Sequence, residues 1–199
     1  MTVAILLTFV STNPGKAREV REILRPYGIR VRWLRRRLPE PQAPDLETVV
    51  RSKLAAVADV PGYAMVEDSG LFIDSLAGFP GVYSAHFLEA WGVPPILELL
   101  RRRSRAASFR AVVGLRRGAA TRLFAGRVDG AIAPRARGTQ GFGYDPIFVP
   151  DGWTTTFAQG PIRAKNEISH RSRAVRKLGE YLRRQESGGR AGRARTHRS

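Results

Sequence analysis

An apolar segment that runs straight into two adjacent acids constrains the fold of this chain more than any other feature. Tyr63-Ala64-Met65-Val66 has the composition of a buried strand, and Glu67-Asp68 follow where we expect that strand to end. Ser69-Gly70 then reads as a turn before a second apolar segment. Neighbouring side chains on a strand point to opposite faces, so only one of the two acids can face a given site unless the chain bends.

A pair of acids in this position suits two kinds of chemistry. In an open α/β sheet, ligand sites lie at the carboxyl ends of strands. Carboxylates there can bind a divalent metal or act as a general base. A strand followed by an ordinary polar turn explains the same residues, and this stretch alone favours neither interpretation.

The composition is typical of a globular protein with one domain or with two small lobes that share a core. The 199 residues are 43 % hydrophobic and include no cysteine, which excludes disulfides, thiolate nucleophiles and zinc–sulfur sites. No apolar run approaches the ~20 residues of a membrane span, and the first residues lack the basic segment of a signal peptide. We therefore expect a cytoplasmic protein without membrane contact.

The charge is strongly positive and unevenly distributed. Thirty-four Lys and Arg residues stand against 17 Asp and Glu, a net charge of +17 that attracts polyanions such as nucleotides and nucleic acid. Arginines gather near residues 30–37 and 101–105 and in a Gly/Arg-rich tail over 186–199, which we expect to be disordered. Seven acids fall between residues 40 and 74, which suggests a metal site unless several lie on exposed helix surface.

A polar loop follows the first predicted strand. Residues 3–10 are almost wholly apolar, and Ser11-Thr12-Asn13-Pro14-Gly15-Lys16 separates them from a helical segment. Backbone N–H groups at a helix start bind phosphate well, and Lys16 adds a point charge. A Walker P-loop would need Gly at position 10 and Ser or Thr at 17, where this chain has Val10 and Ala17. The loop alone favours phosphate binding only modestly over a plain turn.

Further segments alternate between strand and helix patterns. Asp45 can cap a helix that ends near residue 59. Two strand-like runs within residues 106–129 are joined by four residues, which predicts an antiparallel hairpin in a smaller lobe. The other expected elements are a strand over 29–34, helices over 82–91 and 95–103, and a strand over 147–149.

Two groups near the end of the chain are candidate ligand contacts. Phe142-Gly143-Tyr144-Asp145 lies in a glycine-rich loop where an aromatic ring can stack on a base, although buried packing aromatics are commoner. Ser169 fits as the N-cap of the last helix, with Lys165 and His170-Arg171 close to it. Cations at a helix N-terminus are mildly unfavourable, so a bound polyphosphate would explain them, and solvated basic residues are the plain alternative.

Three blocks of residues occur in one order at suitable spacing. The first is Ser11 to Lys16 with Glu19. The second runs from Glu67-Asp68-Ser69-Gly70 to Gly78-Phe79-Pro80-Gly81-Val82-Tyr83-Ser84, and the third from Phe142 to Arg171. Together they resemble the inosine/xanthosine triphosphate pyrophosphatase family, over about residues 3–182.

This resemblance implies an α/β fold with a long twisted mixed sheet flanked by helices. The sheet would belong to a single domain over residues 1–185, in two lobes with a cleft between them. The resemblance also implies a homodimer. The implied reaction is the Mg²⁺-dependent hydrolysis of the purine nucleotides ITP, XTP and dITP to the monophosphate and pyrophosphate, which cleanses the nucleotide pool.

The same resemblance assigns roles to individual residues. Asp68 would bind the metal and act as general base, Glu40 would be a second metal ligand, and Lys53 would reach the phosphates. Glu67 would assist Asp68, and Ser69 would contact the nucleotide. The triphosphate would be bound by Ser11, Thr12, Asn13, Pro14, Gly15 and Lys16. The base and sugar would be contacted by Phe142, Gly143, Tyr144 and Asp145. The base edge and the phosphates would be contacted by Lys165, His170 and Arg171.

Two residues depart from the family pattern. Many relatives carry Arg where this chain has His86, which leaves any role of His86 open. Many carry Glu where this chain has Gln159, which removes an acid near Lys165, so we expect Lys165 to be less well oriented.

Two other functions stay open at this point. The arginine blocks fit a nucleic-acid-binding protein, or weak nonspecific contact with nucleic acid through the tail. A house-cleaning pyrophosphatase for another modified nucleotide would carry the same motifs.

Overall fold

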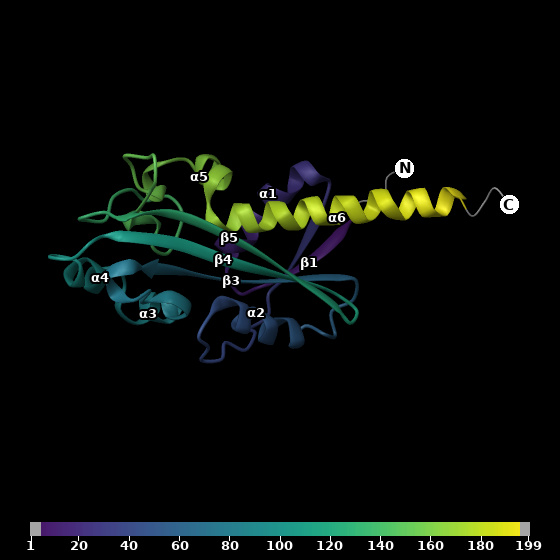
Figure 1. Ribbon diagram of the computed structural model, residues 1–199, viewed down its shortest axis with the longest axis horizontal. Coiled ribbons are helices and arrows are strands. Elements are labelled where there is room, and N and C mark those ends of the chain that lie inside the picture. The colour runs from purple at the N-terminus through teal and green to yellow at the C-terminus, as the bar shows by residue number, and fades with distance from the viewer. Residues whose placement is uncertain (1–4, 196–199) are drawn as a thin grey trace.

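The computed structural model describes the backbone of residues 5–195 and the side chains of residues 5–186. Within them lies a six-stranded mixed sheet with the strand order β2-β1-β3-β4-β5-β6 (Figure 1). The strands are β1 (Leu6–Val10), β2 (Arg30–Leu34), β3 (Tyr63–Ile73), β4 (Ala106–Arg117), β5 (Ala120–Ile132) and β6 (Phe148–Pro150). The helices are α1 (Pro14–Leu24), α2 (Leu46–Ala55), α3 (Ser84–Trp91), α4 (Pro94–Leu99), α5 (Ile162–Ile168) and α6 (His170–Arg195), with short 3-10 turns η1 (Arg25–Tyr27), η2 (Asp74–Leu76), η3 (Gly81–Tyr83), η4 (Asp145–Ile147) and η5 (Phe157–Gln159).

Helices cover both faces of the sheet. In Figure 1, α1 and α6 lie on one side and α2 lies on the other, and we call these sides the α6 face and the α2 face. β1 pairs in parallel with β2 and β3, whereas β3, β4, β5 and β6 pair antiparallel. The predicted α/β fold with a mixed sheet flanked by helices is confirmed.

Side chains that alternate along β3 contribute to cores on opposite faces of the sheet. Met65 belongs to the core beneath α1 and α6, whereas its neighbours Ala64 and Val66 belong to the core beneath α2. A third core around Phe109 and Phe148 fills the far end of the long strands, and α3 and α4 contribute to it. This alternation also sets the direction of the acids that follow Val66.

β3 is longer than the sequence predicts. An end at Glu67-Asp68 and a turn at Ser69-Gly70 are expected, but the strand continues to Ile73. The expectation is wrong because β4 pairs with β3 along its whole length, as far as Ile73 opposite Ala107, and this ladder overrides the local turn preference. Glycine is required at position 70, because a Cβ there would lie only 2.1 Å from the carbonyl oxygen of Gly81.

Other predicted features are confirmed. The hairpin expected within 106–129 forms from β4 and β5. Asp45 caps α2 by accepting a hydrogen bond from Thr48 N (2.8 Å), and Ser169 caps α6 by accepting one from Ser172 N (3.2 Å). The helix expected to reach residue 103 ends earlier, since α4 stops at Leu99.

α6 extends past residue 185, where the sequence predicts that the helix gives way to a disordered tail. Its backbone is helical to Arg195. Lengthening an existing helix adds hydrogen bonds without a new nucleus, and this offsets the poor helix propensity of the glycines in the segment. Residues 196–199 lie outside the described residues. In the described part of the chain, no helix is long and apolar enough to cross a membrane.

Candidate active site

The loop after β1 borders an open side of β3. β1 pairs with β3 only as far as Phe9 opposite Met65. Beyond Met65, no described strand flanks β3 on the side of β1. Two hydrogen bonds fasten the loop to the end of β2. Ser11 N donates to Leu34 O (3.2 Å), and Trp33 Nε1 donates to Ser11 O (2.7 Å). The start of α1 and the segment after β2 therefore meet beside the uncovered part of β3.

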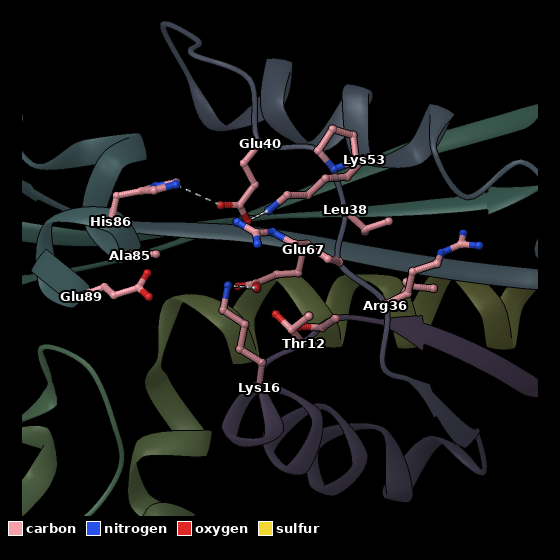
Figure 2. Close-up of a pocket in the computed structure, with 14 residues that line it drawn as sticks. Thr12, Lys16, Arg36, Leu38, Glu40, Lys53, Glu67, Ala85, His86 and Glu89 are labelled. Carbon is pink, nitrogen blue, oxygen red and sulfur yellow. Dashed lines mark hydrogen bonds and ion pairs between the residues drawn. The ribbon is translucent and has the colours of Figure 1, made fainter.

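A cavity of about 550 Å³ lies there, a volume within the range of small-molecule sites. We call it the larger cavity, to distinguish it from a smaller one beside Phe142. Figure 2 shows Lys16 reaching Glu67 on one wall and Lys53 reaching Glu40 on the other. The predicted site residues that line it are Ser11, Thr12, Lys16, Glu40 and Lys53.

Glu67 and Asp68 point to opposite faces of the sheet, as the alternation predicts. On the α6 face, Glu67 Oε2 lies 2.6 Å from Lys16 Nζ, and Glu67 Oε1 accepts from Arg171 Nε at 3.2 Å. On the α2 face, Asp68 Oδ1 lies 2.7 Å from Lys53 Nζ. Both acids border the region that β1 leaves uncovered, so one ligand at the open side of β3 could be reached from both faces.

Lys53 joins two carboxylates. Its ammonium lies 2.8 Å from Glu40 Oε1 as well as 2.7 Å from Asp68 Oδ1. A separate cavity of about 380 Å³, the Asp68 cavity, is lined by Asp68, Glu40, Tyr83 and His86. Glu40 borders both this cavity and the larger one, and its outer oxygen lies 3.9 Å from His86 Nε2.

A buried ionic cluster lies beneath the α6 face of the site. Glu19 Oε1 lies 2.8 Å from Lys165 Nζ, and its other oxygen pairs with Arg171 Nη1. Lys165 also pairs with Asp145 (2.6 Å), while Arg171 Nη2 donates to Ser69 Oγ (3.1 Å). Every charged member is buried and has an opposite charge beside it, as buried ions require. The cluster fixes the start of α6 against α1 and β3.

The aromatic loop closes over this cluster. Asp145 Oδ2 accepts from Phe142 N at 2.9 Å, which holds the loop in a tight turn. The Phe142 ring centroid lies 4.6 Å from Lys165 Nζ and 5.4 Å from Arg171 Cζ. A smaller cavity of about 110 Å³ lies here, and its lining includes Asn13, Lys16, Ser69, Phe142, Gly143, Tyr144, Asp145, Lys165, His170 and Arg171.

Four predicted site residues have mainly structural contacts. The Tyr144 hydroxyl donates to the carbonyl oxygen of Ser84 (2.9 Å), and the His170 ring stacks on Phe109 with centroids 4.7 Å apart. Pro14 is the first residue of α1, a position where its missing N–H costs nothing. Gly15 follows it, and neither Pro14 nor Gly15 lines the larger or the smaller cavity.

The two adjacent acids differ in their affinity for a proton. Burial tends to raise the pKa of Glu67, but Arg171 and Lys16 outweigh it and hold that pKa well below its usual range. Burial also raises the pKa of Asp68, and here the single close cation, Lys53, does not offset it. Asp68 is therefore the stronger base of the pair.

Burial also shifts the groups around the smaller cavity. It raises the pKa of Asp145 despite the neighbouring Lys165. For His170, burial and the nearby Arg171 hold the pKa well below the ordinary value, so the ring is neutral at neutral pH. His170 thus serves as an uncharged packing group beside the buried ionic cluster.

The model of the Ham1 family matches residues 7–181 of this chain. The chain belongs to the Ham1 family. It is 44 % identical to the dITP/XTP pyrophosphatase of Thermococcus kodakarensis over 178 residues, 88 % of this chain and 96 % of that protein. It is also 44 % identical to the dITP/XTP pyrophosphatase of Pyrococcus horikoshii over 176 residues, 87 % of this chain and 95 % of that protein.

Solved structures agree with this assignment. The Ham1 protein of Staphylococcus aureus has a TM-score of 0.77 at 28 % identity, covering 90 % of this chain and 99 % of that one. A HAM1 protein of Coxiella burnetii has a TM-score of 0.76 at 29 % identity, covering 89 % of this chain and 98 % of that one. The resemblance found in the sequence is confirmed.

Glu19 is a residue of this Ham1 site that the sequence analysis did not assign. It is fully buried, and Arg171 and Lys165 hold its pKa below the usual range although burial opposes them. A signal was available, because Glu19 falls on the same helix stripe as the buried Val20 and Ile23. An acid on the buried stripe of a helix needs a cationic partner, which points to a polar cluster.

Gln159 does not weaken the Ham1 site in the way the sequence suggests. Its Oε1 accepts a hydrogen bond from Thr156 N (3.0 Å) and so caps η5. Lys165 is oriented by Glu19 and Asp145 instead. The expected loss of orientation at Lys165 is therefore wrong, since its partners come from α1 and the aromatic loop.

The carboxylates of the Ham1 site fit a cation that is only partly held by protein. Among the described residues, no group of three or more His, Asp or Glu could hold a metal ion. Glu40 and Asp68 share the ammonium of Lys53, so one oxygen of each lies within hydrogen-bond distance of a common point. Mg²⁺ takes one or two carboxylates together with water and substrate phosphates, which this pair can provide.

Proposed function

We propose that this Ham1 protein hydrolyses the non-standard purine nucleotides ITP, dITP and XTP to the monophosphate and pyrophosphate. One observation carries the proposal: two lysines paired with carboxylates face a cavity beside the start of α1. The T. kodakarensis and P. horikoshii relatives, both called dITP/XTP pyrophosphatases, support it.

The phosphates would bind where α1 begins. Asn13 accepts from Lys16 N (3.0 Å) and so shapes the first turn, whose other N–H groups suit a phosphate. Lys16 and Lys53 would exchange part of their contact with Glu67 and Glu40 for phosphate oxygens. Because those carboxylates already hold the ammonium groups in place, little side-chain entropy is lost on binding.

Glu40 and Asp68 would hold Mg²⁺ together with the substrate phosphates. The metal would supply charge stabilisation at the oxygen between the α- and β-phosphates as their bond breaks. Lys53, which contacts both acids in the structure, would add its own charge near that oxygen.

Asp68 would accept the proton of the attacking water. The Asp68 cavity adjoins the larger cavity at Glu40 and His86, and a water held there would attack the α-phosphorus from the side away from the leaving pyrophosphate. The water oxygen bonds to phosphorus, its proton passes to Asp68, and the bond to the bridging oxygen breaks. Burial raises the pKa of Asp68 and so strengthens it as a base, and general base catalysis is worth ~10²–10⁴-fold.

The base would lie in the smaller cavity with Phe142 stacked on the purine. Hypoxanthine and xanthine present a 6-oxo group, whereas adenine presents an amine there. A buried N–H donor from Arg171 or the backbone would pair with the oxo group. Facing an amine instead, an unpaired donor costs ~1–3 kcal/mol.

A panel of nucleotides tests the proposed function. Purified protein is incubated with ITP, dITP, XTP, the standard triphosphates and modified pyrimidine triphosphates, with and without Mg²⁺, and pyrophosphate release is measured. We expect Mg²⁺-dependent release, fastest from the deaminated purines. Release from modified pyrimidine triphosphates alone would show that the substrates are those nucleotides and not deaminated purines. No release from any nucleotide would reject the proposal.

We also propose that the protein is a homodimer. Phe79, Tyr83 and Trp91 are exposed by 39, 44 and 64 %, and Phe87 contacts both Phe79 and Trp91 with ring centroids 5.2 and 5.0 Å away. Several exposed aromatic side chains in one part of the chain, which we call the aromatic surface, are typical of a protein interface. A second copy of this chain is the occupant we propose for it.

A cytoplasmic location is proposed as well, because the nucleotide pool lies there and the chain lacks cysteine. Weak, nonspecific contact with nucleic acid is proposed as a side activity. The net charge of +17 supports it.

A further inference from the structure

Four cationic side chains line the larger cavity, and three of them are already paired. Lys16 pairs with Glu67, and Lys53 pairs with Glu40 and Asp68. Arg36 makes two hydrogen bonds to Asp59, at 2.8 and 3.0 Å, and one to the carbonyl oxygen of Ala56. Arg37 is the fourth, and within the described residues no hydrogen bond or ion pair engages it.

The backbone brings Arg37 to this position. Because Ser11 N binds Leu34 O, the chain leaves β2 directly beside the Ser11–Lys16 loop. Arg36 is then anchored to Asp59, and Arg37 follows it as an exposed residue on the cavity wall. Arg35 is also exposed but does not line the cavity.

The residues that line the two cavities indicate how a bound nucleotide would be oriented. Lys16 and Ala85 line both of them, whereas Phe142 lines only the smaller one and Arg37 only the larger one. In Figure 2, Ala85 lies toward one side of the residues that line the larger cavity and Arg36 toward the other, with Lys16 between them. A nucleotide with its base near Phe142 would therefore extend its terminal phosphates toward residues 36–38.

Charge balance also favours a contact at this end. A triphosphate carries several negative charges, while Lys16 and Lys53 are partly neutralised by their own carboxylates. An unpaired guanidinium has no such partner to give up. It can also bind two phosphate oxygens at once, which an ammonium cannot do in the same fixed geometry.

We propose that Arg37 binds the terminal phosphates, the part of the substrate that leaves as pyrophosphate, and so favours triphosphates over diphosphates. This inference rests on the proposed function for its substrate. It adds a specificity residue that lies outside the three sequence blocks and outside the acids that carry the chemistry.

Arg37→Ala tests the inference, with Arg35→Ala as the matched control from the same exposed segment. KM and kcat are measured for ITP and IDP, after circular dichroism shows that both variants keep the fold. We expect Arg37→Ala to raise the KM for ITP at least about tenfold, with a smaller effect on IDP and little change in kcat. Arg37→Lys should lie between Arg37→Ala and the wild type, and Arg35→Ala should resemble the wild type.

A direct binding experiment separates this inference from the proposed function. Calorimetric titration with inorganic tripolyphosphate needs no turnover, and we expect about tenfold weaker binding in Arg37→Ala than in Arg35→Ala. Equal affinities and equal KM values for the two variants would overturn the role of Arg37. If the wild type hydrolyses no nucleotide but binds tripolyphosphate through Arg37, the proposed function fails while the phosphate contact stands.

Discussion

Glu67 and Asp68 are neighbours in the chain, yet their surroundings give them opposite tasks. Glu67 has a cation at each oxygen, so it stays ionised and holds Lys16 and Arg171 in place. Asp68 has one cation and a water-accessible cavity beside it. The difference arises from the strand geometry, which sends one acid to α1 and α6 and the other to α2.

Asp68→Asn should lower kcat for ITP by at least about 10²-fold, because the amide cannot accept the proton of the attacking water. Pyrophosphate release measures the effect, and the thermal midpoint shows whether the fold persists. Asp74→Asn, an exposed acid at the end of the same strand, is the control and should keep wild-type turnover. Turnover unchanged in Asp68→Asn would remove Asp68 from the reaction.

The buried acids predict how stability depends on pH. Glu19 and Glu67 have lowered pKa values in the folded protein, so their ion pairs stabilise it fully at pH values above the ordinary Glu pKa of about 4.3. As the pH falls below that value, the unfolded chain binds protons before the folded protein does, which favours unfolding. The stability that these two acids contribute should therefore fall with pH until their lowered pKa values are passed.

Thermal midpoints between pH 7 and pH 2 check this prediction. Glu19→Gln should lower the midpoint at neutral pH, because Arg171 loses a buried partner at a cost of about 3–5 kcal/mol. It should also make the midpoint less sensitive to acid than in the wild type. An equal acid dependence in both proteins would show that Glu19 is not the group responsible.

At the scale of elements, the sequence predicts which segments are strands and helices better than where they end. The caps at Asp45 and Ser169 and the β4–β5 hairpin follow from local patterns and are confirmed. The length of β3 depends on a partner more than 30 residues away, and no local pattern reveals such a pairing. The same applies to Glu19, whose partners lie on α5 and α6.

Gly126→Ala should disturb the contact between β5 and α6. A Cβ at this position would lie 2.1 Å from the carbonyl oxygen of His170 and 2.7 Å from Ala174 N, so the helix start must move. We expect a loss of about 1–3 kcal/mol in stability, measured by urea unfolding. The KM for ITP should rise because Arg171 moves with the helix.

Ala125→Ser, at the exposed neighbouring position of β5, is the control for Gly126→Ala. This substitution also adds one heavy atom, but the added atom does not approach α6. It should leave the free energy of unfolding within about 0.5 kcal/mol of the wild type. A Gly126→Ala protein as stable as this control would show that the close approach of β5 and α6 is not required.

At the scale of the whole molecule, the candidate site depends on contacts between distant segments. Lys16, Glu67 and Arg171 are far apart in the chain, and the sheet brings them to one place. Their common location follows from the family resemblance, but the division of the site into separate cavities does not. That division requires the register of β1 against β3, which only the structure provides.

The aromatic surface predicts the oligomeric state. Trp91→Asp should convert the proposed dimer to a monomer, because a charge would be buried in an apolar contact. Light scattering after size exclusion measures the mass of both proteins. Leu99→Asp, an exposed apolar residue on α4 outside the aromatic surface, should leave the mass unchanged. A monomeric wild type would contradict the proposal.

The net charge predicts a salt-dependent affinity for nucleic acid. Fluorescence anisotropy with a labelled single strand should show weak binding that falls steeply between 50 and 200 mM salt, as counterion release requires. Asp68→Asn should bind equally well, because this contact does not use the site. Binding that is independent of salt, or competed by ITP, would contradict a nonspecific side activity.

β3 extends beyond the end of β1, and this has a consequence for how the protein can change. The two acids lie in a strand that β4 pairs with along its whole length, whereas the parts proposed to meet the purine and the far end of the phosphate chain belong largely to loops around it. A new nucleotide preference can therefore arise by substitution in segments 35–39 and 138–145, without any displacement of the hydrolytic centre. Related proteins that differ in substrate should have diverged in those loops while sharing the strand.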